Sequence, residues 1–565
     1  MPKTVSSRLW FTPALLWTVL GFGAIGLSLG TSGILLREWF NAGGLTQLWK
    51  FIAAAGHPDL SSELLGLTLK ATLTTLAYAV CSTLFSVLLG LVGGVLGSEV
   101  WWQTVFPDRQ ALRPSRFWLL ARGLLAFPRA IHELIWGLFF VNLWGLDPLT
   151  AVLAIAIPFG AITAKVFGEI LDETPRQPLE VLLNSGVAAP TAFCYSLLPQ
   201  AFLNLLSYMF YRFECSIRSA TVLGIIGAGG LGYEILLSLQ SLRYEQLWTF
   251  FYALFWLNGV VDFGSAWLRR RLGCASRLDL NLQRQSGGKT LSADRQGNRL
   301  DLPLLGGSAL VLVVGSFWYV NANFSLLWAS RTHQLLGEIG RSAFPPDWSI
   351  LPQLLPLSLE TLAMSVLAIA LAGGGGMVLA FPAAFNFFLP GGILYPARGR
   401  LGGLLPWLVL LSSRAVLLMG RAIPAPIWAL VCLFVLFPGI LPGAIALGLH
   451  NLGILGRLKA EVIENLDTRP LEALKGQGAP GSLVFLYGVL PLTLPRFLAY
   501  DLYRWEVCMR ETVIVGLVGA GGLGRLLTEQ LSSFDYRGIG VTLGCFLLLT
   551  FGLDWLSAQL RRSLR

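Results

Sequence analysis

Long apolar runs alternate with short polar segments along the whole chain. Each run holds about 20 residues or more, enough for an α-helix to cross a hydrocarbon core about 30 Å thick. The pattern predicts an all-α, polytopic membrane protein of about twelve transmembrane helices. We expect the first run to be a retained span rather than a cleaved signal peptide. The predicted spans lie near residues 15–36, 66–97, 117–145, 148–168, 199–226 and 246–268, and near 303–322, 352–385, 404–437, 440–460, 491–518 and 538–559.

The second half of the chain repeats the first at a shift of 292 residues, without a gap from the third span onward. Residues 199–232 and 491–524 are identical at 14 of 34 positions. Because each half has an even number of spans, the two copies should share one orientation, with a pseudo-two-fold axis along the membrane normal and a pathway between them. The predicted domains are a first transmembrane repeat, a cytoplasmic linker and a second transmembrane repeat: 1–268, 269–301 and 302–565.

Charge supports a membrane location and gives the orientation. Charged residues make up 13% of the chain, about half the usual share in soluble proteins. The net charge of +10 comes mainly from Lys and Arg in polar loops, so the positive-inside rule explains it without a nucleic-acid partner. We predict a multi-pass inner-membrane protein in the lipid bilayer, with both termini cytoplasmic. The basic segments are the N-terminus, the linker, and two groups of arginines (Arg109, Arg113, Arg116; Arg561, Arg562, Arg565).

Each half carries the same polar loop between its fourth and fifth spans. A Pro suited to a helix start precedes a Glu in the first turn, where the helix dipole favours an anion. A Gly six residues later permits the left-handed turn that ends a short helix. We predict a two-turn helix with an exposed acid in both loops, although a plain interfacial loop would share this pattern. The residues are Glu180, Gly186 and Pro199 in the first half, and Glu472, Gly478 and Pro491 in the second.

The fifth span of each half carries charges at membrane depth. The set comprises Arg212, Glu214 and Arg218, and Arg504, Glu506 and Arg510. Each Glu lies four residues before an Arg, so the two share a helix face. Such charges either line a substrate pathway or neutralise each other and brace the helix bundle. Counted from Pro199 and Pro491 at 1.5 Å per residue, Arg218 and Arg510 should lie about 28 Å along the helix, in the outer half of the bilayer and facing one another.

A glycine-rich motif, GAGGLG, follows these charges in both halves. The spacing matches a dinucleotide-binding fingerprint, but the strand of a soluble βαβ unit is missing. We predict instead that these glycines break the helix or allow close helix packing, as a gate near the outer mouth of the pathway. They are Gly227, Gly229, Gly230 and Gly232, and Gly519, Gly521, Gly522 and Gly524.

The polar loops resemble the EAA loop of ABC importer permeases. The fifth spans, with RAIHELIW at 129–136 and RAIPAPIW at 421–428, resemble permeases of phosphonate-type importers, which include phosphite and hypophosphite carriers. The chain departs from this pattern in both loops, which read Glu-Val-Leu and Glu-Ala-Leu where the family tends to Glu-Ala-Ala. It also departs at His132, where the family favours Pro, and at Ala425, where it favours Glu.

The resemblance implies a type I ABC importer transmembrane-domain fold and a permease rather than an enzyme. A dimer of separate ATPase subunits would seat on the helices of Glu180 and Glu472. Those subunits would bind ATP and Mg, with no cofactor in this chain, and an extracytoplasmic binding protein would deliver the substrate. Phosphonate, phosphite, a phosphate ester and another small oxyanion all stay open as the substrate.

Two other function classes fit less of the sequence. An ion-coupled secondary transporter would also have internal repeats and broken helices, but it gives no reason for two Glu/Gly loops on the cytoplasmic side. An intramembrane enzyme would need a nucleophile–base pair or a metal cluster, and the sequence has no HExxH. The SGGKT of Ser286–Thr290 is not a complete P-loop, because Gln283 stands where its first Gly belongs.

Overall fold

The chain folds almost entirely into α-helices. The computed structural model describes residues 13–32, 39–106, 116–272, 301–389, 391–394 and 404–563. Within these ranges the elements are helical, apart from one isolated β-bridge between Phe40 and Leu436. The all-α prediction is confirmed. Most of the predicted linker, with the SGGKT segment, lies outside the described residues, as do Arg109, Arg113 and Arg565.

Each of the twelve predicted spans falls on a helix or on a pair of helices that meet at a bend. In the first half these are α1 (Pro13–Thr31), α3 (Ser62–Gly97), α5 (Arg116–Ala130) with α6 (Glu133–Trp144), α7 (Pro148–Glu173), α10 (Leu198–Leu223) and α12 (Tyr244–Arg271). In the second half they are α14 (Asp301–Val320), α16 (Leu351–Ala383), α18 (Leu404–Ala422) with α19 (Ala425–Cys432), α20 (Ile440–Glu464), α23 (Leu490–Gly516) and α25 (Tyr536–Ser563).

Length and hydropathy support most of these spans directly. Within the described ranges, seven helices are long and apolar enough to cross a membrane, or up to nine if each bent pair is one span. The bends are 81° between α5 and α6 and 56° where the helix containing α10 meets α11 (Leu231–Gln240). The apolar stretches whose side chains the structure describes in α1 and α14 are shorter, Gly21–Thr31 and Gly306–Val320.

The chain forms two compact units that exchange their first spans. One unit comprises residues 1–52 with 341–565, and the other comprises 53–340. Helix α1 therefore packs on α16 of the second half, whereas α14 packs on α3 of the first half. The units do not coincide with the repeats predicted from the sequence, whose boundaries stay a prediction.

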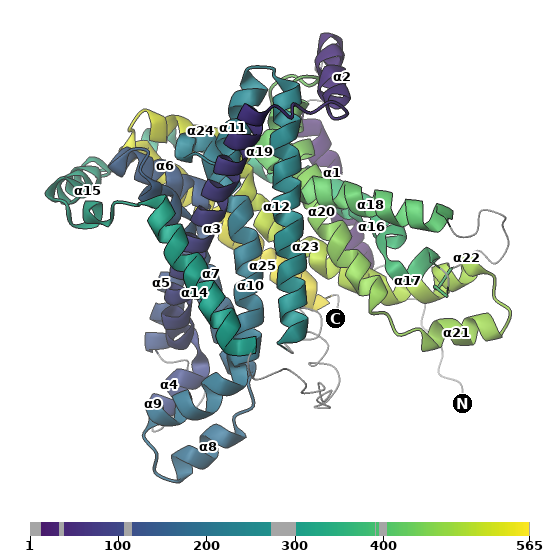
Figure 1. Ribbon diagram of the computed structural model, residues 1–565, viewed down its shortest axis with the longest axis horizontal. Helices are drawn as coiled ribbons and strands as arrows, with labels where there is room; N and C mark the ends of the chain where they lie inside the picture. Colours follow the sequence, from purple (N-terminus) through teal and green to yellow (C-terminus); the bar gives the residue numbers. More distant parts are fainter. Residues whose placement is uncertain are drawn as a thin grey trace. The chain divides into compact units, whose positions relative to one another are not determined.

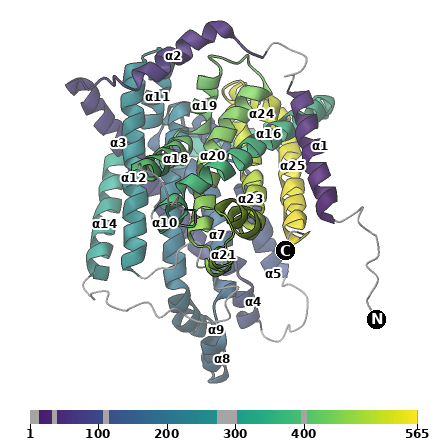
Figure 2. The same ribbon diagram turned by 90° about the vertical axis from the view of Figure 1, so that its right-hand side faces the viewer.

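In the unit of residues 53–340, α3 and α7 form the central pair. Glycines of α3 let the two backbones approach closely, since a methyl group at Gly94 would lie 2.6 Å from Cβ of Phe167. Helices α10, α12 and α14 pack against α3, and they run side by side in Figures 1 and 2. The core is a continuous apolar cluster that includes Ile155, Phe159 and Leu223.

The other unit repeats this arrangement with α16 and α20 as its central pair. Helices α18, α23 and α25 pack around the pair. Glycine contacts again bring helices together, because a methyl group at Gly420 would lie 3.3 Å from Cα of Gly453. The buried cluster of this unit includes Met364, Ala425 and Val515.

Short helices gather at the two ends of each unit. At one end lie the helices next to the Glu/Gly loops, which we call the loop end: α4 (Glu99–Val105), α8 (Gln177–Asn184) and α9 (Ala189–Ala192), and α17 (Phe385–Phe388), α21 (Arg469–Gly476) and α22 (Gly481–Leu483). Figure 1 shows α4, α8 and α9 together at the foot of their unit, and α6, α11 and α15 at the opposite end. The remaining short helices are α2 (Leu45–Ala54), α15 (Ser330–Ser342) and α24 (Gly522–Ser532).

Candidate functional site

The polar loop of each half forms the predicted two-turn helix. Helices α8 and α21 are eight residues each, with Glu180 and Glu472 exposed in their first turns. One leucine beside each Glu is buried and anchors the helix, Leu179 at 3% exposure and Leu471 at 1%. The local geometry of the prediction is confirmed, whereas a role in binding an ATPase stays a prediction.

The glycines of these loops end the helices as predicted. Gly186 and Gly478 adopt φ values of +80° and +82°, a conformation that glycine reaches without steric strain. The chain then enters α9 or α22 and a π-helical turn, Phe193–Leu197 or Val484–Val489, before the fifth span. Several helical residues therefore precede Pro199 and Pro491, which lie inside the continuous helix.

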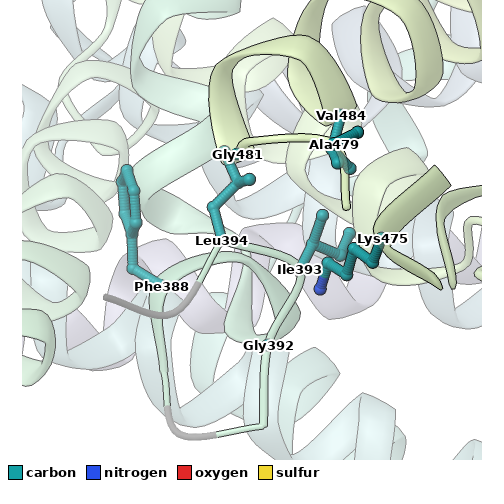
Figure 3. Close-up of a pocket in the computed structure, with 8 residues that line it drawn as sticks. All are labelled: Phe388, Gly392, Ile393, Leu394, Lys475, Ala479, Gly481 and Val484. Carbon is teal, nitrogen blue, oxygen red and sulfur yellow. The ribbon is translucent and has the colours of Figure 1, made fainter. Parts of the chain in front are cut away.

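A cleft of about 590 Å³ adjoins the loop of the second half. Figure 3 shows it between the segment that follows α17 and the segment that joins α21 to the π-helical turn. Its lining is mostly apolar, and Lys475 of α21 supplies its one charged side chain. The lining residues are Phe388, Gly392, Ile393, Leu394, Lys475, Ala479, Gly481 and Val484.

The GAGGLG motifs break the helix in both halves. Six of their glycines have positive φ values, between +69° and +95°: Gly227, Gly229, Gly230, Gly519, Gly521 and Gly522. Gly232 and Gly524 serve close packing, since a methyl group at Gly524 would lie 2.7 Å from Cα of Val513. Thr75 and Thr361 cap the helices that follow by accepting the backbone N–H of Leu231 and of Leu523, both at 2.9 Å. The predicted break is present, and its function as a gate stays a prediction.

The glutamates of the fifth span pair with the sixth span, not with the arginines four residues on. Glu214 accepts from Ser265 of α12 and forms an ion pair of 3.1 Å with Arg269. Glu506 forms the equivalent pair of 2.5 Å with Arg561 of α25. The shift of 292 residues relates the two glutamates and also the two arginines. Arg218 donates to the Cys215 sulfur at 3.7 Å, and Arg510 donates to the backbone carbonyl oxygen of Glu506 at 3.2 Å.

These contacts locate the charges along the sixth span. Helix α12 begins at Tyr244 and ends at Arg271. At 1.5 Å per residue, Ser265 lies about 31 Å from its beginning and about 9 Å from its end. Glu214 therefore lies near the basic end of α12, and Arg218 is one turn away. The depth of the two arginines in the bilayer stays a prediction, and Pro199 does not mark the start of the helix, which begins several residues earlier. That the two arginines face one another stays a prediction.

A second pair of ion pairs fastens the loop ends. Arg122 lies 3.5 Å from Asp172, and Arg414 lies 2.5 Å from Glu464. Each carboxylate also accepts a backbone N–H from the first turn of the neighbouring short helix, α4 or α17. The shift of 292 residues relates these residues as well. Each half thus ties its third and fourth spans together at the loop end.

The interiors of the two halves differ at equivalent positions. Arg212 stacks on the ring of Phe159, with 4.1 Å from the guanidinium carbon to the ring centroid. Its counterpart Arg504 instead donates to Asn451, which replaces Phe159, and binds Glu511 at 2.6 Å. An aromatic–cation contact in one half is therefore a hydrogen-bonded network in the other.

A buried ion pair is present at one of two equivalent places. Lys459 has no exposed side-chain surface, lies 2.8 Å from Asp501 and donates to the carbonyl oxygen of Gly373 at 2.8 Å. The equivalent residues of the first half are Phe167 and Met209, which are apolar. Among the described residues, no group of three or more His, Cys, Asp and Glu side chains is placed to hold a metal ion.

Comparison with known proteins supplies the family. The profile of the family described as "binding-protein-dependent transport system inner membrane component" matches residues 110–273 and, a second time, residues 399–565. The chain belongs to this family. It is an inner-membrane transport component with two copies of the permease domain, and the family description implies partnership with a binding protein and an ABC ATPase.

Named relatives of this permease include transporters of phosphorus oxyanions. The phosphate-import permease protein PhnE of Mycolicibacterium smegmatis is 26% identical over 446 residues, 79% of this chain and 78% of the relative. The phosphite transport system permease protein PtxC of Stutzerimonas stutzeri is 33% identical over 266 residues, 46% of this chain and 90% of the relative. The putative cryptic phosphonate transport system permease protein PhnE2 of Escherichia coli is 36% identical over 118 residues, 21% of this chain and 97% of the relative. No solved structure matches the permease.

Sequence reasoning missed several polar residues of the permease that the structure brings together. Arg269 and Arg561 were interpreted only as part of the basic cytoplasmic charge, although they bind the half-buried Glu214 and the buried Glu506. Their relation by the 292-residue shift was a signal that could have paired them with Glu214 and Glu506. Lys459 and Asp501 offered no such signal, because the first half has apolar residues in their place.

Proposed function

We propose that this permease imports a small phosphorus oxyanion, such as phosphite, phosphate or a phosphonate, into the cytoplasm. The observation that carries the proposal is the family match in both halves, together with relatives named for phosphate, phosphite and phosphonate transport. The exposed glutamates of α8 and α21, each beside a buried leucine anchor, support a docking role for both loops.

Two ATPase subunits would seat on the loop ends, one on α8 and one on α21. They would bind ATP and Mg, while one extracytoplasmic binding protein would deliver the anion to the opposite face. This arrangement places the loop ends and both chain termini in the cytoplasm, in agreement with the positive-inside rule.

Since one chain carries both halves, one copy of it would serve each complex. Native mass spectrometry that finds two copies of this chain in the active assembly would contradict this stoichiometry.

The arginines of the fifth spans would favour the passage of an anion. Guanidinium groups match the oxygens of a phosphorus oxyanion, and Arg212, Arg218, Arg504 and Arg510 carry four of them. Glu214 and Glu506, already paired with Arg269 and Arg561, would limit the attraction so that the anion is released. The GAGGLG breaks would serve as the gate at the end of the pathway opposite the loops.

Reconstitution in vesicles tests the proposed function. The complete permease, with its ATPase and binding protein, should accumulate phosphite, phosphate or methylphosphonate only when ATP is present on the loop side. Replacing Arg218 and Arg510 with Gln should lower uptake while ATP hydrolysis persists. Uptake that follows an ion gradient and needs no ATPase would instead establish a secondary transporter.

A further inference from the structure

Both halves interrupt the helix of the predicted third span near its middle. The interruption, which we call the third-span break, comprises Ile131 and His132 between α5 and α6, and Ile423 and Pro424 between α18 and α19. Backbone groups at such a break lose their partners within the helix and need others nearby.

In the first half, a chain of polar contacts joins the break to the fifth span. Nδ1 of His132 accepts the backbone N–H of Leu134 at 3.2 Å and so caps α6. Its Nε2 lies 3.1 Å from the Glu133 carboxylate. The hydroxyl of Ser219 on α10 donates to that carboxylate at 2.7 Å. Because Nδ1 accepts, Nε2 is the nitrogen that carries the hydrogen toward Glu133.

In the second half, a different residue joins the break to the fourth span. Nδ1 of His450 on α20 lies 3.0 Å from the carbonyl oxygen of Ile423. A carbonyl oxygen only accepts, so Nδ1 of His450 carries the hydrogen. Pro424 occupies the position before α19 and offers no side-chain cap.

The residues at equivalent positions exclude each linkage from the other half. Ala425 stands in place of Glu133 and has no acceptor, and Pro158 stands in place of His450 and has no donor. Glu511 stands in place of Ser219, and its carboxylate binds Arg504 and Asn451 instead. Each half therefore has a linkage that its counterpart cannot form.

The two helices that are linked to the third-span break, α10 and α20, both flank the Glu/Gly loop of their half. The fourth span α20 leads into α21, and the fifth span α10 follows α8 and α9. A displacement of that loop would be passed to the third-span break through α10 in the first half and through α20 in the second.

We propose that Glu133 and His450 are positioning residues that fasten the third-span break to a helix flanking the Glu/Gly loop of their half. Glu133 does so through Ser219 of α10, and His450 does so from α20 itself. Neither residue needs to contact the substrate. The inference rests on the proposed function, since it treats the loops as the place where the ATPase acts. Loss of either linkage should leave ATP hydrolysis in place and reduce the transport that each ATP drives.

The test uses the complete permease with its ATPase and binding protein in vesicles. Phosphite, phosphate or methylphosphonate, whichever the unaltered chain accumulates best, is supplied on the side of the binding protein. Glu133→Ala and Ser219→Ala each remove the first linkage. Glu133→Gln keeps an oxygen that accepts from Ser219. We expect Glu133→Ala to lower the anion accumulated per ATP hydrolysed about tenfold, the size of a typical coupling energy, and Glu133→Gln to restore most of it.

The second half provides an independent pair of variants. His450→Leu removes the donor to Ile423, whereas His450→Asn keeps an N–H of similar reach, so the first should lose coupling and the second should retain it. Matched controls remove interhelical hydrogen bonds that do not touch the break. They are Thr83→Val, which removes a 2.9 Å bond to Ser216 of α10, and Trp505→Phe, which removes a 3.1 Å bond to Ser365.

The ratio of transport to hydrolysis separates coupling from simple instability, which would lower yield and both rates together. Equal ratios in the unaltered permease, Glu133→Ala and His450→Leu would overturn the inference while leaving the proposed function intact. An equal fall in the two control variants would also overturn it, because any lost interhelical bond would then suffice. If the unaltered permease accumulates none of the three anions with ATP, the proposed function fails, and the inference fails with it.

Discussion

The ion pairs that join the fifth and sixth spans are copies of one another in the two halves, whereas the ion pair that joins the fourth and fifth spans of the second half has no counterpart in the first. Glu214 with Arg269 and Glu506 with Arg561 share residue types, helices and the participation of a serine. By contrast, the ion pair of Lys459 corresponds to two apolar residues in the first half.

The difference shows which contacts can change after a duplication. A buried ion pair resists loss of one partner, because the other charge then stays buried without compensation. It can be exchanged for an apolar pair of similar volume when both partners change together. Lys459 and Asp501 differ together from their counterparts Phe167 and Met209, whereas the pairs between the fifth and sixth spans have both partners in each half.

The largest effect should come from the exposed acids of the loops, which both halves share. Replacing Glu180 and Glu472 together with Lys should reduce ATP-driven uptake to background, because both docking helices would present the wrong charge to the ATPase. Expression should stay unchanged, since both side chains are exposed. Vesicle uptake and the yield of purified protein measure the two outcomes. Full uptake by the double variant would remove the loops from the mechanism.

The duplicated ion pairs predict equal losses in the two halves. Glu214→Ala and Glu506→Ala each leave an arginine without its carboxylate, at a cost of about 3 kcal/mol in the free energy of unfolding. Thermal unfolding of the purified permease should show similar decreases in Tm for the two variants. A large decrease in one and none in the other would show that the pairs are equivalent in sequence alone.

The diverged pair predicts a rescue. Lys459→Phe and Asp501→Met, made singly, should each destabilise the permease by about 3 kcal/mol. The double variant installs the residues of the first half, Phe167 and Met209, and should recover to within about 1 kcal/mol of the unaltered chain, because the two positions are in contact and their effects do not add. Additive losses in Tm would show that Gly373, which Lys459 also contacts, requires the charge.

The smallest effect concerns a surface pair beside the second loop. Arg469 lies 2.6 Å from Asp467, with side chains 87% and 51% exposed. The side-chain and backbone N–H groups of Arg469 hold the pKa of Asp467 below its ordinary value. Any contribution of this pair to the free energy of unfolding is therefore present at pH values above the ordinary pKa of Asp. It is lost as the pH falls through the lowered pKa of Asp467. Asp467→Asn should leave Tm unresolved from the unaltered value at pH 7, and a clear decrease would contradict this.

The sequence predicted features that depend on neighbours along the chain. Apolar runs located the spans, and Gly186 and Gly478 located the turns that end α8 and α21, because hydrophobic length and glycine conformation are local properties. For the glutamates of the fifth span, the sequence left open whether each neutralises the Arg four residues on. Spacing places Glu214 and Arg218 on one face, but Arg269 on another helix is the partner that the structure provides.

The remaining misses have physical causes of the same kind. The π-helical turn at Phe193–Leu197, which extends the helix before Pro199, was not predicted either. The linkages of the third-span break involve His450 and Ser219, which no motif singles out. Their role depends on which helix lies beside Ile423 or Glu133, and hydrophobic pattern alone does not determine it.

The exchange of first spans bears on how such a chain tolerates being cut. A protease that cleaves between residues 273 and 300 would produce two fragments, each with helices in both compact units, because α1 belongs with the second half and α14 with the first. We expect the fragments to remain associated, as two separately translated polypeptides would. The covalent fusion then contributes a fixed one-to-one dosage of the halves and a high local concentration during assembly.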